Sequence, residues 1–79
     1  MKTIQWTEEE RNTILERGEV CYAVAEKAME RSGLSFDDIE RINQHTENHR
    51  WGSDADRRYR ERAVRRAIEK VAANAAEYL

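Results

Sequence analysis

Apolar residues recur at steps of three and four along most of the chain, which is the period of helices that bury one side. This pattern predicts three helices, over residues 8–31, 36–49 and 54–78, and no proline interrupts them. The third is the most clearly specified, because Ser53 and Asp56 have the spacing of a capping box at its start. Its apolar stripe consists of Val64, Ala67, Ile68, Val71, Ala75 and Tyr78.

The first predicted helix also has a capping box, formed by Thr7 and Glu10. The apolar positions on its face are Ile14, Leu15, Gly18, Cys21, Tyr22, Ala25, Ala28 and Met29. Because the small residues Gly18 and Ala25 lie near the middle of this face, we expect a neighbouring helix to cross closely there. Ser32 and Gly33 then end the helix, with the glycine in a left-handed conformation.

The second predicted helix begins after Ser35, a residue favoured at N-caps, and has a narrow stripe of Phe36, Ile39 and Ile42. The connections between helices are only a few residues long, so successive helices fold back on each other. The sequence therefore predicts one small all-α domain over residues 1–79, a three-helix fold built as a helical hairpin plus a short helix.

The chain is short and highly charged, which limits the core that it can form. Its 79 residues are 38% charged, and many of its core candidates are alanines. A domain of this size buries only about 60% of its unfolded surface. We therefore expect oligomerisation to complete the domain, as a homodimer or a higher assembly.

Cysteine content and hydropathy define the expected setting. Cys21 has no second cysteine with which to form an internal disulfide, which fits a reducing compartment. No apolar run approaches the roughly 20 residues that span a bilayer. Met1 leads directly into polar sequence rather than into a signal peptide. We expect a cytoplasmic protein without a membrane partner.

Charge is distributed unevenly along the chain. Residues 50–70 carry eight bases and four acids, whereas residues 1–49 carry six bases and eleven acids. Four arginines project together from the third predicted helix: Arg58, Arg62, Arg65 and Arg66. Guanidinium groups bind both phosphates and carboxylates, so this arginine face suits either nucleic acid or an acidic protein surface, and we favour the acidic partner.

Two further sets of residues are candidates for partner binding. The first predicted helix has an acidic face formed by Glu9, Glu16, Glu19, Glu26 and Glu30, which offers electrostatic steering. The tryptophans Trp6 and Trp51 are candidates for apolar contacts that supply affinity. An alternative role for the acidic face is to pair with the arginines, within the chain or across a dimer.

Candidate chemistry is sparse. His45 and His49 are four residues apart and share a helix face, so both imidazoles can reach one zinc ion, but the sequence names no third ligand. Cys21 lies on an apolar stripe without an identifiable base, which is typical of a small buried side chain. We expect no enzymatic activity and no cofactor.

The N-terminal residues carry two resemblances. The opening IQWTEEE resembles the start of a Myb-type repeat, but Trp51 is the only other tryptophan and the regular spacing of that family is missing. Ile4 and Trp6 alternate with polar residues as in a short strand. MKTIQW followed by a helix and then GLS is similar to a ribbon-helix-helix repressor, which implies a dimer that reads the major groove. The first helix predicted here is far longer than in that family.

These features predict a small non-enzymatic interaction or regulatory protein. Small, charge-polarised helical proteins of this kind resemble accessory factors of phages and mobile elements that bind and inhibit a host protein. The competing interpretations are a nucleic-acid-binding regulator that uses the arginine face and a metal-binding protein that uses His45 and His49.

Overall fold

The computed structural model describes residues 3–43 and 53–79, with the side chains of residues 53–56 excepted. This part of the chain contains four α-helices: α1 (Glu8–Arg17), α2 (Tyr22–Arg31), α3 (Phe36–Asn43) and α4 (Ser53–Ala73). A short 3-10 helix, η1 (Ala75–Tyr78), follows α4. The prediction of an all-helical fold is confirmed, and the prediction of three helices is wrong.

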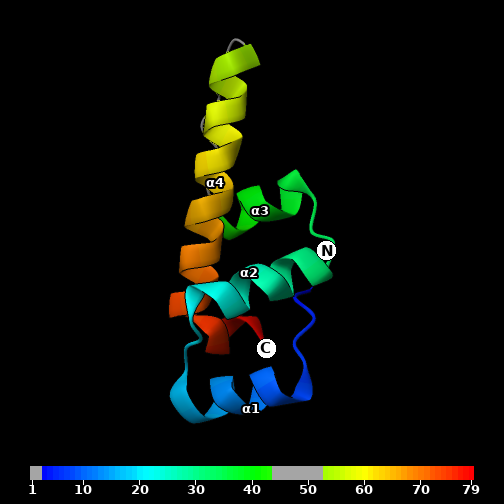
Figure 1. Ribbon diagram of the computed structural model, residues 1–79, viewed down its shortest axis with the longest axis vertical. Coiled ribbons are helices and arrows are strands. Elements are labelled where there is room, and N and C mark those ends of the chain that lie inside the picture. The colour runs from blue at the N-terminus through cyan, green and yellow to red at the C-terminus, as the bar shows by residue number, and fades with distance from the viewer. Residues whose placement is uncertain (1–2, 44–52) are drawn as a thin grey trace.

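The molecule measures 43 × 21 × 19 Å, and helix α4 runs along its longest dimension (Figure 1). Its 21 residues extend about 31 Å at 1.5 Å per residue. Helices α2 and α3 lie across it in Figure 1, and η1 lies between α1 and α2 at the lower end. The first turns of α4 extend above α3, whereas its last turns lie beside α2 and η1.

The helix predicted over residues 8–31 is broken at Gly18. This glycine has φ 80°, and its N–H donates to the Ile14 carbonyl at 2.6 Å, which ends α1. Cys21, in an extended conformation, is the N-cap of α2. The apolar spacing continues through the break because Cys21 and Tyr22 keep the helical period, although both are exposed. The close crossing expected at Gly18 and Ala25 is wrong at Gly18, where no atom beyond the chain neighbours lies within 4 Å of the position that a Cβ would take. Ala25, in contrast, is fully buried in the core with residues of α4.

Three other predicted helix ends are confirmed by the structure. The Thr7–Glu10 capping box is confirmed, as is the left-handed conformation of Gly33, which has φ 61°. The N–H of Asp38 donates to the Ser35 hydroxyl at 3.2 Å, which confirms the cap of α3. Residues 44–49 of the second predicted helix lie outside the described residues. The third helix ends at Ala73 rather than at residue 78.

The core is formed mainly by α2 and α4. Its buried members are Ile4, Ala25, Ala28, Met29, Ala67, Ile68, Val71 and Ala72. Half of these are alanines, whose small side chains let the two helix backbones approach closely. Ile14 of α1 is also fully buried, but Leu15 beside it is 68% exposed, so α1 contributes little to the core.

The N-terminal segment closes this core from the side. Residues 3–7 contain no strand, so the expectation of a short strand is wrong, but Ile4 is buried against the core. None of the described helices is long and apolar enough to cross a bilayer.

Candidate interaction surface

The arginine face lies on the solvent-exposed side of α4. Arg58, Arg62, Arg65 and Arg66 are all exposed, on the side of the helix away from Ala67 and Val71. None of the four forms an ion pair with any residue that the structure describes. The guanidinium groups are therefore available to a partner.

The predicted acidic face of a single helix does not exist as such. The break at Gly18 places Glu9 and Glu16 on α1, leaves Glu19 in the connection, and places Glu26 and Glu30 on α2. All are exposed except Glu26, which is half-buried. The prediction of one continuous acidic face is wrong, because it assumed an unbroken helix over residues 8–31.

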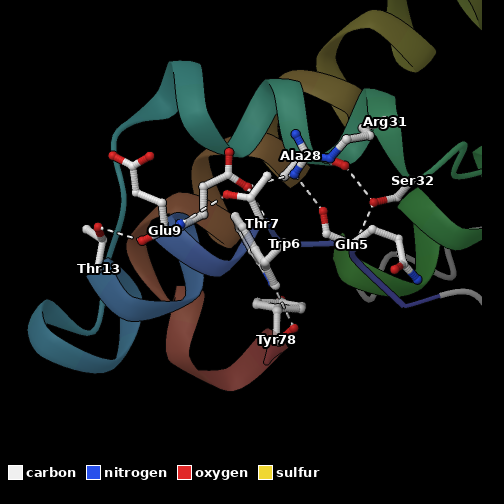
Figure 2. Close-up of polar contacts among 10 residues, drawn as sticks. Gln5, Trp6, Thr7, Glu9, Thr13, Ala28, Arg31, Ser32 and Tyr78 are labelled. Atoms are coloured by element: carbon white, nitrogen blue, oxygen red, sulfur yellow. Dashed lines mark hydrogen bonds and ion pairs between the residues drawn. The ribbon is translucent and has the colours of Figure 1, made fainter.

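Trp6 joins the two ends of the described chain. Its indole N–H donates to the Tyr78 carbonyl at 3.1 Å, and its half-buried ring packs against the core (Figure 2). Burial, with a smaller contribution from the charge of Glu77, raises the pKa of Tyr78 above its ordinary value. These contacts give Trp6 a structural role at the contact between the N-terminal segment and η1. Trp51, the other predicted contact, lies outside the described residues.

A network of polar contacts fixes α1 and the N-terminal segment against α2 (Figure 2). The Arg31 guanidinium donates to Glu10 at 2.7 Å and to the Gln5 carbonyl at 2.6 Å. The Gln5 N–H donates to the Ser32 hydroxyl at 2.7 Å. Burial alone would raise the pKa of Glu10, but hydrogen bonds from Thr7 and the charge and hydrogen bond of Arg31 lower it below the ordinary value.

Sequence reasoning missed a groove that α2, α3 and α4 form together, which we call the interhelical groove. Its volume is about 590 Å³. It is lined by Tyr22, Glu26, Met29, Glu30, Leu34, Ile39, Arg57, Arg60, Glu61, Val64, Arg65 and Ile68. Apolar side chains from all three helices form its floor, and charged side chains from α2 and α4 form its rims. Treating Gly18 as the end of a helix would have placed Tyr22 at the start of α2, but residue spacing does not predict how α2, α3 and α4 cross.

The rims of the groove carry opposite charge. Glu26 and Glu30 form an acidic rim on α2, while Arg57, Arg60 and Arg65 dominate the rim on α4. Three arginines and three glutamates, including Glu61 on α4, line the groove, so its formal charge is zero. The surface is thus polarised rather than basic or acidic.

Ring contacts hold α3 against α4 beside this groove. The Arg60 guanidinium lies 4.9 Å from the centre of the Phe36 ring, within the range of a cation–π contact. Phe36 and Tyr59 meet edge to face at 6.3 Å, and the Tyr59 hydroxyl donates to Glu40 at 3.2 Å. Arg60 is exposed, as are Arg57 and Arg65, but it is the one of the three that contacts a ring of α3.

The structure provides no support for the candidate metal-binding and thiol residues within the described part of the chain. His45 and His49 lie outside the described residues. Within residues 3–43 and 53–79, no three histidine, cysteine, aspartate or glutamate side chains come together as a metal site would require. Cys21 is an exposed thiol in a second hollow of about 890 Å³, between α1, α2 and the end of α4, rather than a buried core residue.

Comparisons with known proteins give no identification: no protein-family model matches the chain, and neither do the curated proteins nor the solved structures.

Proposed function

We propose that this chain is a small non-enzymatic interaction protein that regulates a protein partner by binding an acidic surface on it. The observation that carries this proposal is the arginine face of α4, where four exposed guanidinium groups have no ion pair within the described chain. A helix fixes the spacing of these groups before binding, so less freedom is lost when they meet carboxylates. The inhibitors of phages and mobile elements that bind host proteins remain the functional analogy.

We also propose that the chain acts as a homo-oligomer in the cytoplasm. Among the described residues, the two largest fully buried side chains are Ile14 and Val71, which indicates a thin core. Small domains of this kind commonly gain stability by association. Self-association would also present more than one arginine face to the partner.

Nucleic acid is the competing ligand, because the same four arginines are suited to phosphates. Two features favour the protein partner. The exposed Glu61 and Glu69 interrupt the basic surface of α4, and each adds a charge that repels a phosphate backbone. No aromatic side chain on α4 is exposed beside the arginines for base stacking, since Tyr59 is half-buried against Phe36.

Site-specific photo-cross-linking in the cell that naturally produces the chain tests the proposal. A photoreactive amino acid replaces Arg62, and the matched control replaces Arg11, an exposed arginine on α1. We expect a protein adduct from position 62 that is absent from position 11. A nuclease-sensitive adduct would support the nucleic-acid alternative, and an absence of position-dependent adducts would contradict both interpretations.

The cross-linked protein is then purified and its affinity measured by calorimetry. We expect Arg58→Glu with Arg62→Glu to weaken binding by at least about tenfold, because two attractive contacts become repulsive. The control, Arg11→Glu with Arg41→Glu, makes the same change of charge at exposed positions away from this face. An equal loss of affinity in both variants would show that net charge, not the arginine face, determines binding.

A further inference from the structure

We propose that the interhelical groove binds the interhelical groove of a second copy of this chain, across a two-fold axis. The inference rests on the self-association proposed above and names the surface that mediates it. Charge complementarity, an apolar floor and one exposed aromatic side chain identify the second copy as the occupant.

The charge pattern of the groove is complementary to itself. Its acidic rim lies on α2 with Glu26 and Glu30, and its basic rim lies on α4 with Arg57, Arg60 and Arg65. A two-fold axis that lies in the interface, perpendicular to the line between the rims, reverses the direction of that line. Each acidic rim then faces the basic rim of the other copy. Like-charge contacts arise only if the axis runs along that line, so the charges also select the geometry.

The floor of the groove supplies apolar surface for the same contact. Met29 and Ile68 are each 6% exposed, and Leu34, Ile39 and Val64 are half-buried around them. Three large apolar or aromatic side chains of the described chain are notably exposed, namely Leu15, Tyr22 and Leu79, and of these only Tyr22 lines the groove. An aromatic side chain at the edge of an apolar groove is a typical anchor of a protein interface. Each copy therefore offers Tyr22 to the floor of the other.

Ligands with one dominant charge fit this surface less well. The formal charge of the groove is zero, so a nucleic acid or a strongly acidic protein would be repelled by Glu26 and Glu30 at one rim. A uniformly basic segment would be repelled at the other rim. The arginine face, in contrast, is charged with one sign at Arg58, Arg62 and Arg66, none of which lines the groove. The two surfaces thus suit different ligands.

The first measurement is the molar mass of the unmodified chain by light scattering behind size exclusion, over a range of concentrations. We expect a dimer that dissociates on dilution. A monomer at every concentration would overturn the proposal, as would an assembly that does not contain an even number of chains.

Two charge-reversal variants then locate the interface. Glu26→Arg with Glu30→Arg leaves the groove with five bases and one acid, whereas Arg57→Glu with Arg65→Glu leaves it with five acids and one base. Arg60 is left unchanged because it contacts the Phe36 ring. We expect each variant alone to dimerise at least about tenfold more weakly than the unmodified chain. An equimolar mixture of the two is expected to form a heterodimer, because opposite charges then meet at both rims.

The control variant is Arg11→Glu with Arg41→Glu, which makes the same change of charge as Arg57→Glu with Arg65→Glu at exposed positions outside the groove. We expect it to remain a dimer. Dimers in both groove variants, or two monomeric variants that do not pair when mixed, would overturn the proposal. If either variant loses its helical circular dichroism, Tyr22→Ser replaces it, since Tyr22 is 39% exposed and we expect this change to disturb the fold less than two charge reversals do. Undiminished dimerisation of Tyr22→Ser would also overturn the proposal.

These measurements use no partner protein. A monomeric chain that still gives a protein adduct from position 62 would refute both the groove interface and the proposed self-association, and would leave the proposed binding of a protein partner standing. A dimeric chain without such an adduct would support the groove interface and contradict the proposed binding of a protein partner through the arginine face.

Discussion

Glu10 has two structural roles in one side chain. Its carboxylate accepts from the Thr7 N–H at 3.1 Å, as half of the capping box of α1, and from Arg31 of α2 at 2.7 Å. The first contact starts a helix, and the second attaches that helix to its neighbour. A capping interaction contributes about 0.5–2 kcal/mol, whereas an exposed ion pair contributes less than about 1 kcal/mol.

The lowered pKa of Glu10 predicts a dependence of stability on pH. The contribution of this carboxylate is fully present above the ordinary glutamate pKa of 4.5 and is lost as the pH falls through the lower value of the folded state. We therefore expect Glu10→Gln to destabilise the protein at neutral pH and to reduce the loss of thermal stability between about pH 7 and pH 3. Thermal unfolding followed by circular dichroism checks this, with Glu9→Gln as the control at an exposed neighbouring position. A pH dependence unchanged in Glu10→Gln would contradict the assignment.

At the scale of elements, the break between α1 and α2 determines the arrangement of the molecule. Gly18 ends α1, and the chain then returns past the end of α4, where the Val20 N–H donates to the Ala72 carbonyl at 3.0 Å. The Ala76 N–H donates to the Gly18 carbonyl at 3.2 Å, which connects η1 to the same turn. These two hydrogen bonds satisfy backbone groups that a continuous helix would have satisfied internally.

Substitution of Gly18 distinguishes a broken helix from a continuous one by the sign of its effect. At φ 80° an alanine is strained, although there is space for its Cβ, so we expect Gly18→Ala to destabilise the protein by about 1–2 kcal/mol. In a continuous helix the same change would stabilise by about 1 kcal/mol. Chemical denaturation measures the difference. Increased stability would contradict the break between α1 and α2.

Local signals predicted the elements well where one residue type determines the outcome. The Thr7–Glu10 capping box, the N-cap Ser35 and the left-handed Gly33 all act over a few residues, and each is in place in the structure. The exposed arginines followed from helical period alone. The break at Gly18 does not follow from the apolar spacing, because the helical period of apolar residues continues through Cys21 and Tyr22.

The interhelical groove could not be predicted from residue spacing, because it is built from several helices. Its lining comes from three helices, and only the break at Gly18 brings the acidic rim of α2 to the basic rim of α4. On one long helix, Glu26 and Glu30 would belong to the same face as Glu16 and Glu19. Surfaces built from several elements depend on how the helices cross, which the spacing of residues along one helix does not encode.

At the scale of the whole molecule, we propose two separate binding surfaces: the arginine face for a protein partner and the interhelical groove for a second copy of the chain. The arginine face lies on the exposed side of α4, and the groove is lined by residues of α2, α3 and α4 with Leu34 between α2 and α3. Arg65 is the one residue of the arginine face that also lines the groove. A dimer formed through the groove would leave Arg58, Arg62 and Arg66 free in each copy. The central claim is that these arginines are directed at carboxylates of a protein rather than at phosphates.

The measurement that tests this claim most directly is the fluorescence anisotropy of labelled duplex DNA and single-stranded RNA, titrated with the purified chain over a series of salt concentrations. We expect dissociation constants weaker than about 1 µM at physiological ionic strength, the range of non-specific electrostatic binding. Arg58→Glu with Arg62→Glu should abolish what remains at low salt, and Arg11→Glu with Arg41→Glu should reduce it less. Binding tighter than about 1 µM that weakens linearly on a logarithmic salt scale, and is lost only in the first variant, would contradict the account and identify the arginine face as a phosphate-binding surface.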